Sequence, residues 1–307
     1  MSVIVPTRNR SALLREALAS VDRLRGVDLE IELIVVDNNS TDDTVLVAQQ
    51  FGAKVVAAER IGAGAARNAG LAAATGDFLA FLDDDDVFLP GHLRPHISYM
   101  AEHLDIDAVV GQAVNTDVTG QQHGDAFPQD LPRHGDLFAS FLEYCPQLGA
   151  TVVRNCVRTA VPWFDETLID PATNLFSTDE DWDWHLRVAL HHRVGFVPVP
   201  CVLFRHRPLG SDFDLLWRRL PFTKLVYRNN LRRAGHRRPS SAIVARTVFR
   251  QHGWYCIQLL DAARCVAAAG DYRHARKARL RAFLVSPPHA VKGLLFRRKL
   301  TDLTTSH

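Results

Sequence analysis

Over its first 82 residues the chain alternates short apolar runs with amphipathic or alanine-rich segments, and this order constrains the fold more than any other feature. The apolar runs, in which residues that favour strands are frequent, lie at 1–6, 31–36, 54–58 and 78–82. Three intervening segments have the spacing or composition of helices and lie at 11–24, 41–51 and 63–74. Strand–helix alternation of this kind predicts an α/β fold with a mainly parallel sheet and helices on both faces.

Polar residues follow three of these strands. Pro6 and Thr7 come after the first strand, Asp37 ends the second, and Asp83–Asp86 follow the fourth. The carboxyl ends of parallel strands form one edge of a sheet, and ligands bind beyond it. We therefore expect these residues to line one rim. After the second strand, Ser40 and Asp43 have the spacing of a capping box, which predicts that the next helix begins near residue 41.

Four consecutive aspartates directly after a buried strand are unfavourable for folding alone, because they repel one another and lose hydration. A positive partner should compensate them. Mg²⁺ and Mn²⁺ prefer carboxylate oxygens and keep positions for substrate phosphates, so the run favours a metal–diphosphate site. A Ca²⁺ site and a solvated acidic turn are the alternatives.

Periodicity weakens between residues 115 and 146, where a long loop or small excursion is expected. A strand at 150–153, a helix at 179–191 and a strand at 195–204 follow, and three or four helices are expected beyond residue 212. We predict three parts, at 1–114, 115–210 and 211–307, the last of which is a basic helical region.

The net charge of +2 hides a strong asymmetry between the two ends of the chain. Residues 1–204 contain 14 Lys and Arg against 29 Asp and Glu, whereas residues 205–307 contain 22 against 5. A basic C-terminal third could meet anionic lipid, a phosphorylated acceptor, nucleic acid or the acidic part of its own chain.

Five cysteines without a C-x-x-C pair predict neither a disulfide framework nor a zinc site, and favour a reducing cytoplasm. No leader pattern and no apolar run near the roughly 18 residues of a spanning helix is found. We expect a cytoplasmic protein, with a place at the inner face of the plasma membrane as the further possibility.

Several separated motifs occur in the order found in one known family: Val3–Arg10, Ile34–Thr44, Gly64–Gly70, Phe81–Asp86, Trp163–Glu166 and Glu180–Asp183. Over about residues 1–210 the chain resembles the family 2 glycosyltransferases, which have the Rossmann-like GT-A fold. The resemblance implies an inverting enzyme that moves one sugar from a nucleoside diphosphate sugar to a glycan or lipid-linked acceptor, as in cell-envelope synthesis. It also implies a donor-binding part at 1–114 and an acceptor-binding and catalytic part at 115–210. The sequence Trp184–Arg187 departs from the Q-x-x-R-W motif of processive synthases, which favours transfer of a single sugar.

The resemblance also implies roles for residues. Asp83 and Asp85 correspond to the D-x-D motif that binds Mn²⁺ or Mg²⁺, and Asp181 corresponds to the general base. A helix N-cap is the alternative for Asp181. His206 stands where related folds place a third metal ligand; a phosphate contact and a plain surface histidine are the alternatives. Contacts with the donor are expected from Pro6, Thr7, Asn9, Asp37, Arg67, Asn68, Asp83 and Asp84.

Other functions have weaker support. Gly62–Arg67 resembles a dinucleotide fingerprint, but its final glycine is replaced by Arg67. A nucleotidyltransferase would have a glycine-rich basic loop after the first strand, which Pro6–Asn9 does not resemble.

A non-catalytic binding protein is the third alternative. Residues 228–238 are rich in arginine but poor in aromatics, so nucleic acid is not expected as a partner. An anionic membrane would suit a mixture of apolar and basic residues: Leu215, Leu216, Trp217, Leu220 and Phe222 beside Arg218, Arg219 and Lys224. A solvated helical cap is the plainer interpretation.

Overall fold

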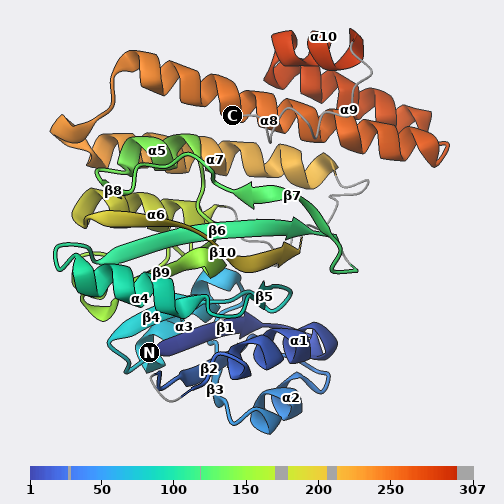
Figure 1. Ribbon diagram of the computed structural model, residues 1–307. Helices are drawn as coiled ribbons and strands as arrows, with labels where there is room; N and C mark the ends of the chain where they lie inside the picture. The colour runs from blue at the N-terminus through green and yellow to red at the C-terminus, as the bar shows by residue number, and fades with distance from the viewer. Residues whose placement is uncertain (27–28, 118, 170–178, 206–212, 296–307) are drawn as a thin grey trace. The chain divides into compact units, whose positions relative to one another are not determined.

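The structure is a computed structural model of the 307-residue chain, and it describes residues 1–26, 29–117, 119–169, 179–205 and 213–295. The chain divides into two compact units, residues 1–206 and residues 207–307. Each unit has helices or strands of its own around its own core (Figure 1). The predicted acceptor-binding part at 115–210 therefore shares one unit with the predicted donor-binding part.

The first unit is built on one mixed sheet with the strand order β3-β2-β1-β4-β9-β6-β10-β5, to which β7 is added beside β6 and β8 beside β10. The strands are β1 (Ser2–Thr7), β2 (Glu32–Asp37), β3 (Lys54–Ala57), β4 (Phe78–Phe81), β5 (Val87–Phe88), β6 (Ala108–Thr116), β7 (Gln122–Phe127), β8 (His134–Gly135), β9 (Thr151–Arg154) and β10 (Val194–Arg205). Strands β1 to β4 pair in parallel, as do β6 and β10, whereas β9 is antiparallel to both β4 and β6. This arrangement confirms the predicted α/β fold.

Helices cover both faces of this sheet. In the first unit they are α1 (Ser11–Asp22), α2 (Thr44–Gln50), α3 (Ala63–Ala73), α4 (Leu93–Glu102), α5 (Phe138–Glu143) and α6 (Glu180–His191), with short 3₁₀ turns at η1 (Leu148–Ala150) and η2 (Asn155–Thr159). One core cluster joins Val3 and Val5 of β1 to α1, α2 and α4. Ile4, which faces the other way, is so close to α3 that a Cβ on Gly70 would lie 2.3 Å from its Cγ2. Alternation along β1 thus separates the two helical layers.

Two local predictions were wrong. The segment 115–146 is not a long loop, because β6 continues to Thr116, β7 pairs with it, and β8 and α5 follow. Helix α2 begins at Thr44 rather than near residue 41, and Ser40 does not cap it. Instead the Ser40 hydroxyl accepts a hydrogen bond from the backbone N–H of Asn9, 2.9 Å away. A long-range partner therefore replaced the local cap.

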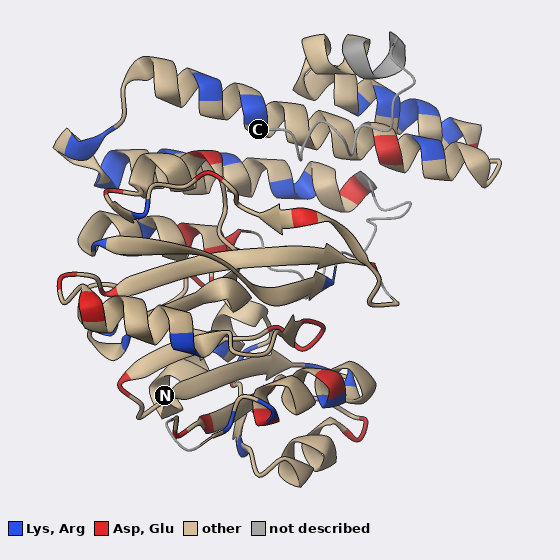
Figure 2. Cartoon of the chain, in the orientation of Figure 1, with Lys and Arg blue, Asp and Glu red and all other residues tan. Residues whose placement is uncertain are grey.

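The second unit is helical in its described part. Its helices are α7 (Phe213–Arg233), η3 (Gly235–Arg237), α8 (Ser241–Ala268), α9 (Tyr272–Val285) and α10 (Pro287–Leu295). Its core is formed mainly by α8, with residues of α7, α9 and α10 packed against it, and Leu216, Leu220, Tyr255 and Leu259 are among the buried residues. Figure 2 shows lysine and arginine along α7, α8 and α9, with few acidic residues among them.

The core of the second unit corrects one sequence-based expectation. Leu215, Leu216 and Leu220 were expected to face a membrane, but all three are buried. Their spacing reflects packing inside the helical unit. Within the described ranges, no helix has both the length and the apolar character needed to cross a bilayer.

Candidate active site

The four aspartates after β4 alternate in environment. Asp84 and Asp86 are buried, whereas the side chains of Asp83 and Asp85 are 39% and 17% exposed. The four residues form a turn, closed by a hydrogen bond from the Asp86 N–H to the Asp83 backbone oxygen at 3.0 Å, and this turn directs their side chains into different surroundings. The two aspartates of the expected metal motif are therefore the two that reach the rim.

Asp84 is hydrogen-bonded to Thr7, the last residue of β1, and to Arg10, which follows that strand. Its carboxylate accepts hydrogen bonds from the Thr7 hydroxyl at 2.8 Å and from the Arg10 guanidinium at 2.7 Å. Burial raises the pKa of Asp84, and Arg10 opposes that shift. Arg10 also lies 3.6 Å from an Asp85 oxygen. Arg10 is thus part of the positive compensation that the acidic run was expected to require.

Asp86 accepts a hydrogen bond from the backbone N–H of Arg205, at the end of β10, at 2.9 Å. Burial raises its pKa well above the usual range for an aspartate, and Asp83 and Asp85 add to the shift. Asp86 therefore connects the acidic run to the last strand of the sheet, and its interior position makes it a structural residue.

Arg67 connects the acidic run to a distant part of the chain. It lies on α3 and is buried, and its Nη2 donates to Asp83 Oδ1 at 2.7 Å. Its Nη1 is ion-paired with Glu180, the first residue of α6. The guanidinium carbon also lies 5.6 Å from the centroid of the Phe164 ring. One cation thus joins β4, α3 and α6.

The two acids at the start of α6 differ in their contacts. Burial raises the pKa of Glu180 to about 7 despite the neighbouring Arg67 cation. Asp181 is partly buried, and its Oδ1 accepts a hydrogen bond from the backbone N–H of Trp182 at 2.8 Å. Burial raises the pKa of Asp181 as well, while Arg67 opposes the rise. The carboxylate of Asp181 can therefore accept a proton, while Arg67 forms ion pairs with the neighbouring Asp83 and Glu180.

Aromatic packing fixes the start of α6. Trp184 stacks on Phe164 with ring centroids 5.1 Å apart and meets Phe81 of β4 edge to face at 5.6 Å. The indole N–H of Trp182 donates to the backbone oxygen of Phe141 at 2.6 Å. Since Phe81 lies two residues before Asp83, this packing brings Asp181 to the same edge of the sheet as Asp83.

The residues expected to contact the nucleotide lie at the carboxyl ends of β1 and β2. The Asp37 carboxylate accepts hydrogen bonds from the backbone N–H of Ser40 at 3.2 and 3.3 Å. Asn9 accepts one from the backbone N–H of Thr41 at 2.7 Å. Pro6 pairs with Val36 in the parallel register and is buried. These contacts join the loops after the two strands into one surface.

Asn68 has a structural environment. Its amide donates to the backbone oxygen of Phe164 at 3.0 Å and to Glu166 at 2.8 Å, and its Oδ1 accepts from the N–H of Phe164. Both ends of the amide are therefore occupied within the chain. Asn68 holds the segment after residue 162 against α3, and its expected contact with the donor stays a prediction.

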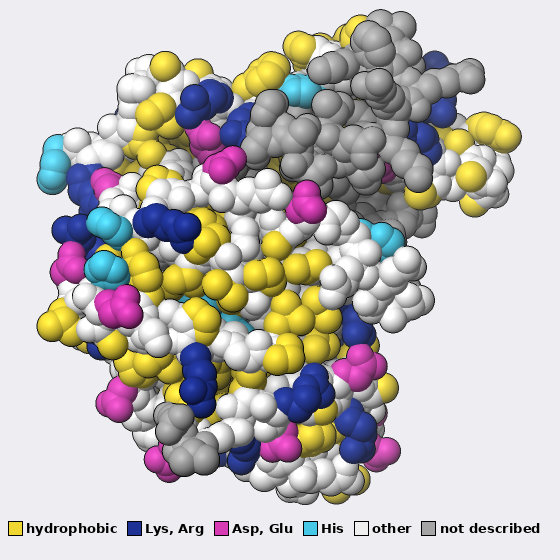
Figure 3. All heavy atoms as spheres, viewed as in Figure 1, with side chains coloured by type: hydrophobic (Ala, Val, Ile, Leu, Met, Phe, Trp, Pro, Cys, Tyr) yellow, Lys and Arg dark blue, Asp and Glu magenta, His cyan; other side chains and the backbone are white. Residues whose placement is uncertain are grey.

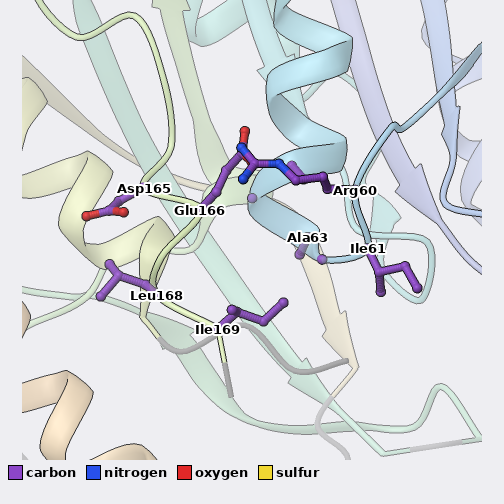
Figure 4. Close-up of a pocket in the computed structure, with 10 residues that line it drawn as sticks. Arg60, Ile61, Ala63, Asp165, Glu166, Leu168 and Ile169 are labelled. Atoms are coloured by element: carbon purple, nitrogen blue, oxygen red, sulfur yellow. The ribbon is translucent and has the colours of Figure 1, made fainter. Parts of the chain in front are cut away.

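A cavity of about 310 Å³ lies at the N-terminal end of α3 (Figure 4). It is bounded by residues 60–65 and by Asp165, Glu166, Leu168 and Ile169. Figure 4 shows Arg60 and Glu166 reaching toward one another across it, and the two form an ion pair. Its volume is at the lower end of the range of about 300–1,000 Å³ for ligand sites. The cavity can hold part of a donor, such as a sugar, but not a whole nucleotide sugar.

The structure brings together most of the expected site residues, namely Thr7, Arg67, Asp83, Asp84, Asp85 and Asp181. His206 lies outside the described residues. Sequence reasoning missed Arg10, Glu180 and the backbone of Arg205. Arg10 belongs to the motif Val3–Arg10, and Glu180 belongs to the motif Glu180–Asp183. Because the four aspartates need a nearby positive charge, Arg10 could have been predicted as their partner.

Comparisons with known proteins agree with this geometry. Residues 2–149 match the family model described as "Glycosyl transferase family 2". The chain belongs to this family. It is a glycosyltransferase that takes its sugar from a nucleotide sugar.

Two relatives cover different shares of this glycosyltransferase. The uncharacterized glycosyltransferase YwdF of Bacillus subtilis is 27% identical over 225 residues, which are 69% of this chain and 76% of YwdF. A Campylobacter jejuni enzyme, the GalNAc(5)-diNAcBac-PP-undecaprenol beta-1,3-glucosyltransferase, is 43% identical over 103 residues. That match covers 30% of this chain and 32% of the Campylobacter enzyme.

Solved structures share the fold at low sequence identity. S. aureus TarS superimposes with a TM-score of 0.61 and 20% identity, covering 92% of this chain and 53% of TarS. The Pyrobaculum calidifontis mannosyltransferase PcManGT, solved with GDP-Man and Mn²⁺, has a TM-score of 0.56 and 19% identity, covering 97% and 87% of the two chains. These likenesses support the GT-A-like sheet with additional C-terminal helices.

Proposed function

We propose that this glycosyltransferase is an inverting enzyme that moves one sugar from a nucleoside diphosphate sugar to an acceptor hydroxyl, with Asp181 as the general base. The observation that carries the proposal is Arg67, which contacts Asp83 at one end of its guanidinium and Glu180 at the other. Because of this link, the aspartates that would hold the metal of the donor diphosphate and Asp181, which would take the proton of the acceptor hydroxyl, belong to one site.

In the proposed reaction the acceptor hydroxyl gives its proton to the Asp181 carboxylate while its oxygen forms a bond to the anomeric carbon. The bond from that carbon to the diphosphate oxygen breaks, and the diphosphate leaves from the opposite face, which inverts the configuration. Burial raises the pKa of Asp181, and a base whose pKa lies nearer the operating pH transfers a proton more effectively.

Asp83 and Asp85 fit a hard divalent cation, since they are the two rim-facing carboxylates of the acidic run. When bound, Mn²⁺ or Mg²⁺ stabilises the negative charge that grows on the departing diphosphate. Thr7 and Arg10 hold the buried Asp84 between the two ligands, which fixes the direction of both. PcManGT was solved with Mn²⁺, which makes the same metal the first to test here.

The nucleotide part of the donor would lie over Pro6, Thr7, Asn9 and Asp37, at the ends of β1 and β2. The cavity at the start of α3 would accept the sugar, because Arg60, Asp165 and Glu166 in its lining can form hydrogen bonds with sugar hydroxyls. S. aureus TarS residues 1–349 were solved with UDP-GlcNAc, so UDP sugars belong in the first donor panel.

A lipid-linked or glycan acceptor is the class we propose. The name of the Campylobacter relative places its acceptor on undecaprenyl diphosphate. In this chain, α9 presents Leu280, Phe283 and Leu284 at 60%, 45% and 64% exposure. These residues have helical i, i+3, i+4 spacing, and Arg276 and Arg279 lie exposed on the same helix.

An exposed apolar stripe beside basic residues is the pattern of a helix that lies on an anionic membrane. At the right edge of the view in Figure 3, dark blue lysine or arginine side chains lie next to yellow hydrophobic ones in the second unit. Co-sedimentation with vesicles containing anionic lipid, at low salt, tests this surface. Leu280→Glu with Leu284→Glu should abolish binding, whereas Leu104→Glu, at an exposed position in the first unit, should not. Equal binding by both variants contradicts an α9 surface.

Calorimetric titration with nucleoside diphosphates, with and without Mn²⁺, tests the donor site. We expect metal-dependent binding of one nucleotide by the wild type and its loss in Asp85→Ala. Asp130→Ala changes an exposed carboxylate outside the site and should bind normally. A folded wild-type protein that binds no nucleotide would contradict the proposal, as would synthesis of a sugar nucleotide from a nucleoside triphosphate without any sugar transfer.

A further inference from the structure

Two histidines and a cysteine meet in the interior of the first unit, outside the site described above. His92 immediately precedes α4, His96 lies one turn further along that helix, and Cys201 lies on β10. All three are buried, and one donor atom from each lies within 4.8 Å of the others. The cysteine is 105 positions from His96, so local spacing in the sequence could not reveal this group.

The imidazole of His92 is buried, and its two nitrogens lack hydrogen-bond partners in the described part of the chain. The exposed fraction of His92 is 0%. A buried polar group without a partner costs about 1–3 kcal/mol, so native interiors rarely contain one. The neighbouring rings of Phe88 and His96, with centroids 4.4 and 4.9 Å from that of His92, hold the imidazole in place.

His96 has the opposite difficulty, since both of its ring nitrogens face carbonyl oxygens. Nδ1 lies 2.9 Å from the backbone oxygen of His92, and Nε2 lies 3.1 Å from that of Ala150. In its neutral form the ring carries a single N–H. One nitrogen must therefore direct a lone pair at an oxygen, which is repulsive unless a cation lies between them.

Cys201 completes the group. Its sulfur lies 3.9 Å from His96 Nε2 and 2.9 Å from the backbone oxygen of Val199, to which the thiol donates. Gly111 faces both side chains, and a Cβ there would lie 2.3 Å from the sulfur and 3.0 Å from Nε2. Only glycine leaves this space free.

We propose that His92, His96 and Cys201 bind a structural Zn²⁺ ion. Nitrogen and thiolate ligands suit zinc, whereas the oxygen-rich acidic run suits Mg²⁺ or Mn²⁺. Zn–N and Zn–S bonds of about 2.0 and 2.3 Å in a tetrahedral site separate the two ligand atoms by roughly 3.5 Å, close to the observed 3.9 Å between Nε2 and Sγ.

The Nδ1–H of His96, donating to the His92 carbonyl, leaves Nε2 free to act as the ligand. The Ala150 oxygen is in position to be a fourth ligand. Binding converts the thiol to a thiolate and releases its proton to solvent.

The ion would connect the core to the acidic run. The backbone N–H of Leu89 donates to the Cys201 oxygen at 2.8 Å, and Phe88 pairs with Val202. These contacts hold β5, which directly follows Asp83–Asp86. Zinc at this point therefore tethers α4 and β10 on either side of the segment that carries the donor-metal aspartates.

Elemental analysis of the full-length chain, purified without chelators or a polyhistidine tag, tests the proposal. We expect about one zinc per chain in the wild type and in Asp85→Ala, and less than a tenth of that in Cys201→Ser. Cys265→Ser, at an exposed position, is the matched control and should keep the ion. Wild-type protein that is folded, contains no zinc and gains no thermal stability with added Zn²⁺ would overturn the proposal.

A second measurement does not depend on a variant folding. Wild-type protein stripped with a chelator and titrated with Co²⁺ should develop the intense absorption of a thiolate–cobalt bond, and added Zn²⁺ should remove it. His92→Asn should lower the affinity for Co²⁺ at least tenfold. Visible absorption typical of oxygen ligands alone would show that the cluster binds no metal. An unchanged affinity in folded His92→Asn would show that His92 is not a ligand, which would overturn the proposed three-residue site.

Discussion

Arg67 Nη2 lies 2.7 Å from Asp83 Oδ1, and the same guanidinium is ion-paired with Glu180. Arg67 and Glu180 are 113 positions apart in the chain. The arginine is buried, and Asp83, Glu180 and Asp181 all favour its charged form, so its pKa is raised above an already high value. A permanent buried cation therefore sets the distance between the proposed metal motif and the proposed base.

Replacing Arg67 by methionine should destabilise the fold and abolish sugar transfer. Removing one partner of a buried ion pair leaves an uncompensated charge and costs about 3–5 kcal/mol. The free energy of unfolding in urea measures this loss. Arg60→Met removes an ion pair from an arginine that is 75% exposed and should cost less than about 1 kcal/mol. Equal losses would contradict a special role for Arg67.

Asp181→Asn should lower the transfer rate by about 10²- to 10⁴-fold, because amide nitrogen and oxygen cannot take the acceptor proton. Binding of the nucleoside diphosphate should stay within a few fold of wild type. Rapid-quench measurement of single turnovers, paired with calorimetric donor binding, separates the two effects. If Asp181 only stabilised the start of α6, the asparagine variant would unfold at lower urea but transfer sugar at a near-normal rate.

The contribution of Glu180 to the stability of the wild type should fall as the pH rises from about 4.5 to about 7. Burial raises the pKa of Glu180 from 4.5 to about 7, so the folded state binds more protons than the unfolded state in this window. This contribution then decreases with pH and levels off above the folded pKa. Buried His96, whose pKa is lowered to about 4, contributes in the opposite direction in both proteins. In urea unfolding at pH 5, 6 and 7.5, the free energy of unfolding of the wild type should therefore fall relative to that of Glu180→Gln. Identical slopes for the two proteins would exclude Glu180 as a source of the effect.

Gly70→Ala should destabilise the first unit by about 1–3 kcal/mol, since overpacking forces the backbone or neighbours to move. The new Cβ would lie 2.3 Å from Ile4 Cγ2 and 3.1 Å from Val36 Cγ2. Gly26→Ala meets nothing within 4 Å and serves as the control in the same thermal unfolding assay. A Gly70 variant as stable as wild type would mean that α3 can move away from β1 at no cost.

The spacing of apolar residues was sufficient to predict the alternating buried strands and amphipathic helices. Strands β1, β2 and β4 and helix α1 lie where apolar spacing predicted them, and so does α6, whose first residue is Glu180. Residues 115–146 were misjudged because β7 is an exposed strand held mainly by pairing with β6, and such a strand has no buried face to give it an apolar pattern. The Ser40 cap failed because Asn9 competes for its hydroxyl.

The sequence alone determined the α/β class, the acidic run after β4 and the residues that could bind a metal and a nucleotide. These properties depend on periodicity, strand ends and residue type, which are local. Only the tertiary structure decided that Asp84 and Asp86 are interior while Asp83 and Asp85 reach the rim, that Arg67 joins α3 to α6, and that Cys201 meets His92 and His96. Those relationships depend on burial and on contacts between distant segments, which arise when the sheet closes against its helices.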